Sequence, residues 1–150
     1  MPNVLARLPD VFRCLHAHDV RYVEIGGIAA IVQGVPRTTV DVDLLIEASD
    51  ENARRLLAAL SEAGIGAAAL TSADGLLRHE ITIFKDVVRI DVQTMTPGVA
   101  FADAWSRRIE REISGTKYWL LSRQDLVATR RAAGRPKDLE DIRVLESGGA

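Results

Sequence analysis

The sequence of 150 residues is poor in the features that mark secreted or nucleic-acid-coating proteins. Its single cysteine, Cys14, cannot form an intramolecular disulfide, and its apolar neighbours predict a small buried side chain. Aromatic residues make up only 5% of the chain, and the formal net charge is −2. A charge so close to neutral argues against a domain that binds nucleic acid through its overall field.

Long apolar runs are also absent near the N-terminus. Charged residues and a histidine interrupt the first twenty positions, namely Arg7, Asp10, Arg13, His16 and Asp19. We therefore expect neither a signal peptide nor a membrane span, and a protein that stays in the reducing cytoplasm. The remaining histidines are scattered as well, so no His/Cys spacing predicts a zinc site.

What the sequence does contain is the composition of an ordinary globular domain. Hydrophobic residues make up 47% and charged residues 27%, and a chain of this length can bury a substantial core. No repeat, linker or low-complexity segment divides it, so we expect residues 1–150 to form a single domain.

The order of the predicted elements indicates an α/β (α+β) fold, in which a mixed β-sheet is flanked by helices and followed by C-terminal helices. Predicted helices cover residues 10–18, 28–33, 50–63, about 100–105 and the chain after Ser122; predicted strands cover 22–25, 40–46, 80–84, 87–94, 109–113 and 118–121. Residues 66–70 are a weak strand candidate, and 71–76 are expected to be a loop. Pro9 is expected in the first helical turn, and Leu139, Ile142 and Leu145 on the inner face of the last helix.

Three aspartates lie on the polar faces of predicted strands. Alternation along residues 40–46 places Asp41 and Asp43 on one side, and residues 87–94 place Asp91 on the polar side of a later strand. Clustered carboxylates repel one another unless cations neutralise them. Because hard oxygen ligands suit Mg²⁺ or Mn²⁺, we expect a divalent-metal site completed by the phosphates of a substrate.

A pair of glycines precedes the predicted helix at 28–33. Gly26 and Gly27 would expose backbone N–H groups at the positive end of the helix dipole, where phosphates bind, and Arg37 would add a charged contact. An ordinary tight turn is the alternative interpretation of the glycine pair. The order and spacing of the glycines and aspartates together favour the phosphate site.

The segment GGIAAIVQGVPRTTVDVDLL resembles the signature of the DNA polymerase β-like nucleotidyltransferase superfamily. Its R-x-T-x-D-x-D motif matches Arg37, Thr39, Asp41 and Asp43, and the third carboxylate of that superfamily matches Asp91. The closing segment DLVATRRAAGRPKDLEDI resembles small prokaryotic nucleotidyltransferases of abortive-infection and toxin–antitoxin systems, the AbiEii-type and minimal branches.

This resemblance implies a two-metal transfer of a nucleoside monophosphate from an NTP, for example ATP, to an acceptor hydroxyl. The catalytic residues and metal ligands would be Asp41, Asp43 and Asp91. The nucleotide would contact Gly26, Gly27, Arg37, Thr39, Arg130 and Lys137. Capping and pairing within the last helix is the alternative role for Lys137 and its neighbours.

Other interpretations stay open at the level of sequence. The chain could be a catalytically silent nucleotidyltransferase-like module that acts as an antitoxin or regulatory partner, or a protein that binds nucleotides without transferring them. For an active enzyme, the acceptor could be an RNA, a protein or a small molecule. A toxin–antitoxin partner or a second copy of the chain is the expected macromolecular partner, since a chain of this size could share its acceptor pocket with another subunit.

Overall fold

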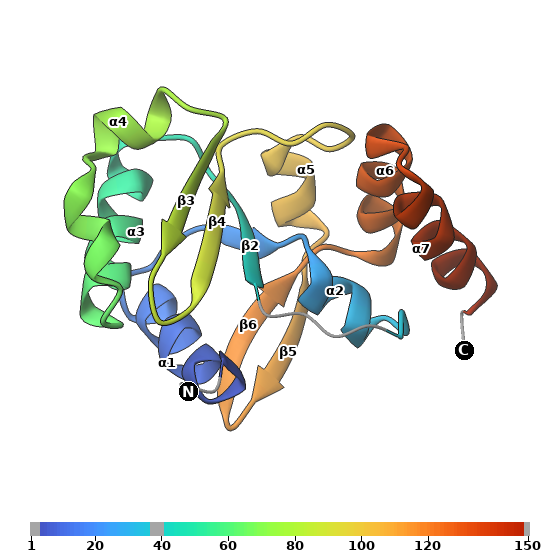
Figure 1. Ribbon diagram of the computed structural model, residues 1–150, viewed down its shortest axis with the longest axis horizontal. Helices are drawn as coiled ribbons and strands as arrows, with labels where there is room; N and C mark the ends of the chain where they lie inside the picture. Colours follow the sequence, from blue (N-terminus) through green and yellow to red (C-terminus); the bar gives the residue numbers. More distant parts are fainter. Residues whose placement is uncertain (1–3, 37–40, 149–150) are drawn as a thin grey trace.

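The computed structural model describes residues 4–36 and 41–148. Within them the chain forms a mixed sheet with the strand order β3-β4-β2-β1-β6-β5, flanked by helices (Figure 1). The strands are β1 (Tyr22–Glu24), β2 (Asp41–Ile46), β3 (Ile81–Lys85), β4 (Arg89–Gln93), β5 (Ile109–Ile113) and β6 (Thr116–Leu120). The helices are α1 (Val4–Ala17), α2 (Gly27–Val32), α3 (Asp50–Glu62), α4 (Ala73–Leu77), α5 (Phe101–Ser106), α6 (Arg123–Ala133) and α7 (Pro136–Ser147), with a 3₁₀ turn η1 (Gly66–Leu70). The predicted mixed fold with C-terminal helices is confirmed.

Strand pairing determines which side chains meet on the sheet. β2 is antiparallel to β1 and parallel to β4, whereas β3 with β4 and β5 with β6 form antiparallel hairpins. A parallel neighbour requires a crossover connection, which α3, η1 and α4 supply between β2 and β4. The beginnings of β2 and β4 therefore lie side by side.

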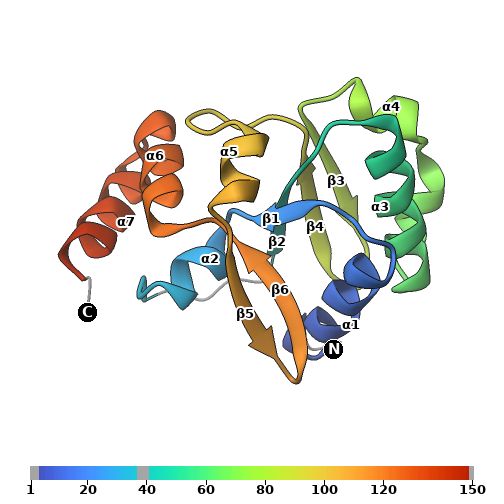
Figure 2. The ribbon, with the colours of Figure 1, turned by 180° about the vertical axis from the view of Figure 1, so that it is seen from behind.

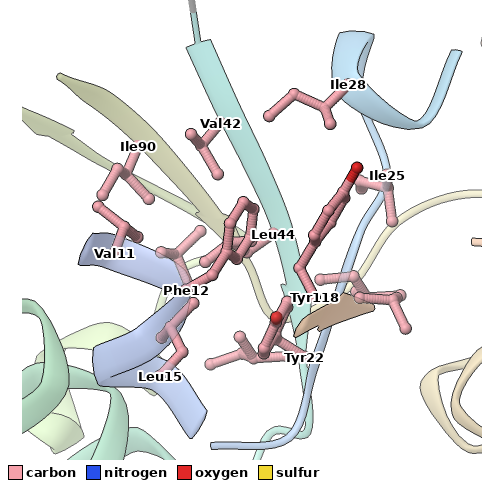
Figure 3. Close-up of a cluster of buried hydrophobic side chains, with 14 of the residues drawn as sticks. Val11, Phe12, Leu15, Tyr22, Ile25, Ile28, Val42, Leu44, Ile90 and Tyr118 are labelled. Atoms are coloured by element: carbon pink, nitrogen blue, oxygen red, sulfur yellow. The ribbon is translucent and has the colours of Figure 1, made fainter. Parts of the chain in front are cut away.

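One face of the central strands is covered by α1. Figure 3 shows Val11, Phe12 and Leu15 of this helix packed near Leu44 and Ile90 of the sheet, and each of these side chains is at most 1% exposed. Burying a side chain of this size contributes about 1.5–3 kcal/mol. This burial fixes the pleat of β2 and β4, because the apolar members of each alternation point toward α1 and the polar members point to the opposite face.

Helix ends follow local chemistry. The Ser122 hydroxyl accepts a hydrogen bond from the Asp125 amide at 3.1 Å, so the predicted cap of α6 is confirmed. Gly134 ends that helix with a φ of 65°, in the left-handed region that glycine tolerates. Within residues 4–36 and 41–148, no helix is long and apolar enough to cross a membrane.

The expectations for residues 66–76 are wrong. The weak strand candidate is the 3₁₀ turn η1, in which the Ala68 amide bonds to the Ile65 carbonyl at 3.0 Å. Alanine and glycine have little strand propensity, and this segment lacks cross-strand partners. The expected loop contains α4, because the Ser72 hydroxyl accepts from the Gly75 amide and caps a short helix.

Two expectations about the helices are also wrong, namely Pro9 in the first turn of its helix and Leu139 on the inner face of α7, whereas Ile142 and Leu145 are buried as expected. Pro9 lies inside α1, because the helix begins at Val4 rather than near residue 10. Leu139 is 52% exposed, and the buried face of α7 consists of Asp138, Asp141, Ile142 and Leu145. The two buried aspartates form ion pairs with arginines that precede α7, so charge pairing rather than apolar spacing sets the rotation of this helix.

Candidate functional site

The strand register brings three aspartates to one face of the sheet. Asp43 on β2 lies directly opposite Asp91 on β4, and Asp41 lies opposite Arg89. All four side chains alternate with buried apolar neighbours, so they project away from the face that α1 covers. The carboxylates that the sequence assigns to separate strands are therefore neighbours in space.

These side chains line a cleft of about 400 Å³ between the sheet and the C-terminal helices. The cleft walls come from the glycine turn, β2, β4, the loop at Thr96 and Pro97, and the facing parts of α6 and α7. In both ribbon views, α6 and α7 lie together at one end of the molecule, with α2 and α5 between them and the central strands (Figures 1 and 2). Segments more than one hundred residues apart in the sequence thus share one cleft.

Among the described residues, Arg89 is the cation paired with the cleft carboxylates Asp91 and Asp41. Its Nε lies 2.9 Å from Asp91 Oδ1 and 4.0 Å from Asp41 Oδ2, and its Nη2 lies 3.3 Å from Asp91 Oδ2. Among the described residues, no three His, Cys, Asp or Glu side chains are grouped closely enough to hold a metal ion. In the described structure, Arg89 is thus a counter-cation of Asp91 and Asp41.

Asp43 has a raised pKa. Burial first, and then the neighbouring charges of Asp91 and Asp41, together raise the pKa of Asp43 to about 6, although Arg130 opposes that rise. A Cβ atom at Gly26 would lie 1.9 Å from Asp43 Oδ2. Gly26 is therefore required because the Asp43 carboxylate packs directly against its backbone, a reason different from the phosphate approach that the sequence indicates.

Glu24, at the end of β1, is a site residue that the sequence analysis missed. It is 0% exposed. Its Oε1 accepts from the amides of Gly26 and Ala29, both at 2.9 Å, and its Oε2 accepts from the Asp43 amide at 2.8 Å. Burial, together with the charge of Asp43, raises the pKa of Glu24 to about 8, although the three amides oppose that rise. An acidic residue inside the apolar run before the glycine pair was the available signal.

This carboxylate changes the role of the glycine turn. The Gly26 N–H group, which was expected to face a phosphate, already donates to Glu24, and the Ala29 N–H group donates to the same oxygen. The amides of Gly27 and Ile28 have no hydrogen-bond partner among the described residues. Of these two amides, that of Gly27 belongs to a residue that lines the cleft, so within the described structure it is the one available to a ligand there.

Arg130 lines the cleft, but its guanidinium is engaged by protein atoms. Nε lies 3.3 Å from Asp141 Oδ2, Nη1 donates to the Ile25 carbonyl at 3.3 Å, and Nη2 donates to the Gly26 carbonyl at 3.2 Å. The side chain is only 12% exposed. Arg130 therefore fastens α6 and α7 to the glycine turn, which explains how the C-terminal helices keep their place over the cleft.

Lys137 differs from Arg130 in being exposed. It lines the cleft from the first turn of α7 and has no hydrogen bond or ion pair among the described residues. The neighbouring Arg135 forms an ion pair with Asp138, with Nε 2.6 Å from Oδ2. Arg37 and Thr39, which the motif assigns to the nucleotide, lie outside the described residues.

Comparison with known proteins gave one family match. A family model described as a nucleotidyltransferase of unknown function, DUF6036, matches residues 5–146. The matched range includes Glu24, the three aspartates and both C-terminal helices up to Glu146. The match supports the superfamily predicted from the sequence and does not identify the abortive-infection branch. A search of curated proteins found no match.

Proposed function

Because the chain belongs to the nucleotidyltransferase family DUF6036, we propose that its cleft transfers a nucleoside monophosphate from an NTP to an acceptor hydroxyl with the help of a divalent cation. The observation that carries this proposal is the register of β2 and β4, which sets Asp43 opposite Asp91 on the face that lines the cleft.

The donor chemistry of the cleft fits Mg²⁺ or Mn²⁺. Asp41, Asp43 and Asp91 offer only carboxylate oxygens, the ligands that these hard cations prefer. The raised pKa of Asp43 reflects burial and repulsion between these carboxylates, both of which a bound cation would offset. A bound divalent ion would neutralise phosphate charge and make the acceptor hydroxyl more acidic. Asp41 and Asp43 would hold it, with Asp91 as the third ligand. Because the described side chains are not grouped closely enough for a metal ion, the three carboxylates would have to move together when the ion binds.

The chain's own residues would then orient the reactants. The acceptor oxygen forms a bond to the α-phosphorus while the bond from that phosphorus to the bridging oxygen of the β-phosphate breaks, and pyrophosphate leaves. Asp91 would accept the proton of the acceptor hydroxyl. For this to happen, Arg89 would have to leave its ion pair with Asp91. Lys137 and the open amide of Gly27 would contact the phosphates.

A second candidate is a module that binds nucleotide without transferring it. The Arg89–Asp91 ion pair favours this alternative, because it occupies the proposed proton acceptor with a cation. Either candidate could act as a component of a toxin–antitoxin or abortive-infection system. For the transferase, RNA, protein and small molecules are the acceptor classes to be tested.

The test combines direct metal binding with a transfer assay. Wild-type protein, Asp43→Asn and Asp91→Asn are first titrated with Mn²⁺. Each protein is then incubated with each labelled NTP, Mg²⁺ and either tRNA or a candidate partner protein. The mass of every component is measured by intact-mass spectrometry. Asp103→Asn, which alters an exposed aspartate of α5 outside the cleft, is the matched control.

We expect wild type and the control to bind Mn²⁺ and add one nucleotide to an acceptor, and the cleft variants to lose both properties while remaining folded. Transfer retained by Asp43→Asn would overturn the metal assignment. Binding of Mn²⁺ and NTP by wild type without any mass increase would support the binding module instead.

A further inference from the structure

A second hollow of about 400 Å³ lies at the opposite end of β1 from the glycine turn, and the two share no lining residue. It is bordered by the end of α1, the turn before β1, α3, the end of α5 and β6. In the view of Figure 2, β1 lies between α3 and α5. Its charged lining consists of Arg21, Arg55 and Arg108 with one aspartate, Asp19.

Arg108 is held by aromatic rings rather than by a carboxylate. Its guanidinium carbon lies 3.7 Å from the centre of the Trp105 ring and 4.7 Å from the centre of the Trp119 ring. Its Nη1 donates to the Trp105 carbonyl at 2.8 Å, and its Nε is buried without a hydrogen-bond partner. No ion pair of Arg108 exists within the described part of the chain. The positive charge is thus positioned but not neutralised.

Two more guanidinium groups border the same hollow. Arg21 lies 5.8 Å from the centre of the same Trp105 ring. Arg21 pairs with Glu47 at 3.2 Å and Arg55 pairs with Glu51 at 2.6 Å, and all four side chains are substantially exposed. Exposed pairs of this kind contribute little to stability, so a ligand can exchange for them at little cost.

We propose that this hollow is a phosphate-binding site, independent of the proposed transfer reaction and of its cleft. Guanidinium groups match phosphate oxygens through paired N–H donors. Three arginines line this hollow, and Asp19 is the one acidic residue among its lining residues. The phosphate would sit between Arg108 and the rim arginines Arg21 and Arg55.

The ligand class follows from which ring faces are already covered. His16 stacks on Trp119 with ring centres 5.1 Å apart, and Phe101 stacks on Trp105 at 5.8 Å. Arg108 covers both indoles as well. Each indole thus already contacts an aromatic ring and the Arg108 guanidinium, which disfavours stacking of a nucleobase. We therefore expect recognition of the phosphate group itself, carried either by a small phosphorylated molecule or by the backbone of a nucleic acid.

The two tryptophans of the sequence, Trp105 and Trp119, both border this hollow, and neither borders the cleft. Intrinsic tryptophan emission therefore reports binding at this site separately from binding at the cleft. The protein is titrated at constant ionic strength with inorganic phosphate, pyrophosphate, a mononucleotide and a 5′-phosphorylated hexanucleotide, with chloride as the reference anion.

We expect a saturable change in emission with the phosphate compounds and none with chloride. Arg55→Gln should weaken binding about tenfold, the effect of losing one charge-assisted contact. Arg54→Gln is the matched control, because this adjacent residue of α3 pairs with Asp50 and lies outside the hollow. Arg108→Lys, which keeps the charge but loses the paired donors, should also weaken binding.

Because Arg108→Lys disturbs the aromatic stack, its thermal unfolding is compared with that of wild type, and Arg55→Gln tests the site without touching the stack. Tighter binding of the hexanucleotide than of pyrophosphate assigns the site to a nucleic-acid backbone, and equal binding assigns it to a small phosphorylated molecule. The absence of a saturable change, or equal affinities in Arg55→Gln and Arg54→Gln, would overturn the proposal. Asp43→Asn, which alters only the cleft, should leave the emission titration unchanged, so failure of the proposed transfer activity does not affect this test.

Discussion

Replacing Glu24 should show whether the glycine turn and the carboxylate strand are held together by one buried acid. Its two oxygens accept three backbone N–H groups, from Gly26, Ala29 and Asp43. Glu24→Gln keeps the shape but replaces one oxygen with an NH₂ group. The oxygen of the glutamine side chain would take the position of Oε1, which accepts from the Gly26 and Ala29 N–H groups. Its NH₂ group would then face the Asp43 N–H group, so two donors would point at each other.

The cost of this change can be worked out from the contacts. One buried N–H group without an acceptor costs about 1–3 kcal/mol, and Glu24→Ala, which leaves all three N–H groups without their acceptor, should cost at least twice as much. In a domain of this length, 1 kcal/mol corresponds to about 2–4 °C in the unfolding midpoint. A protonated Glu24 still has a lone pair on its hydroxyl oxygen for the Asp43 amide, whereas the NH₂ group of glutamine has none. Glu24→Gln should therefore unfold several degrees below wild type at pH 5.

The deficit should shrink as the pH rises. The pKa of Glu24 is raised from an ordinary 4.5 to about 8 in the folded protein, so the folded state binds the proton more tightly than the unfolded state. The resulting stabilisation is complete below pH 4.5 and is lost as the pH rises through about 8, at up to about 1.4 kcal/mol per pH unit. Because glutamine does not titrate, Glu24→Gln does not lose stability in this way, and its deficit relative to wild type becomes smaller as the pH rises.

Urea unfolding of wild type, Glu24→Gln and Glu24→Ala at pH 5, 6, 7 and 8 measures these differences. Glu80→Gln, at an exposed glutamate without a side-chain hydrogen bond in the described structure, is the control and should stay within about 0.5 kcal/mol of wild type at each pH. A Glu24→Gln protein as stable as wild type at pH 5, or a deficit that widens toward pH 8, would refute the reasoning.

Three further predictions concern the cleft. Arg89→Gln should bind Mn²⁺ about tenfold more tightly by calorimetry, because a cation no longer competes for Asp41 and Asp91, while its unfolding midpoint in chelator falls; unchanged affinity would contradict this. Gly26→Ala should lose about 1–3 kcal/mol in urea unfolding and bind Mn²⁺ weakly, because the new Cβ would lie 1.9 Å from Asp43 Oδ2; full Mn²⁺ affinity would be the opposing result. In wild type, Mn²⁺ affinity should fall about tenfold per pH unit below about 6, the raised pKa of Asp43, since a proton then competes for its carboxylate. The same raised pKa makes Asp43 stabilise the metal-free fold below its ordinary pKa of 3.8 and lose that contribution as the pH rises through about 6. A pH-independent Mn²⁺ affinity would exclude Asp43 as the titrating ligand.

The sequence predicted well those parts of the fold in which the spacing of apolar residues alone determines which side chains are buried. Alternation in β2 and β4 correctly separated the polar face from the buried face. The cap at Ser122 and the stop at Gly134 were also predictable, because each depends on one residue and its immediate backbone.

The errors occurred where long-range pairing competes with local pattern. The apolar spacing of α7 favoured Leu139 as an inner residue, yet Asp138 and Asp141 are buried instead. Their partners, Arg135 and Arg130, supply the charge that makes burial of a carboxylate tolerable. Sequence spacing alone does not reveal that Arg130 is committed to the glycine turn and to Asp141 before any phosphate arrives.

The same alternation that predicts Asp91 on the cleft face also places Arg89 there, two residues earlier on the same strand. The alternation therefore places both the carboxylates and their counter-cation on the cleft face, although the sequence analysis predicted a functional role only for the aspartates. In the metal-free protein, Arg89 offsets the repulsion that would otherwise fall on Asp91 and Asp41. Under the proposed metal binding, a divalent ion would have to displace this guanidinium from Asp91, so the affinity of the cleft for metal would depend on the difference between the two cations rather than on the carboxylates alone.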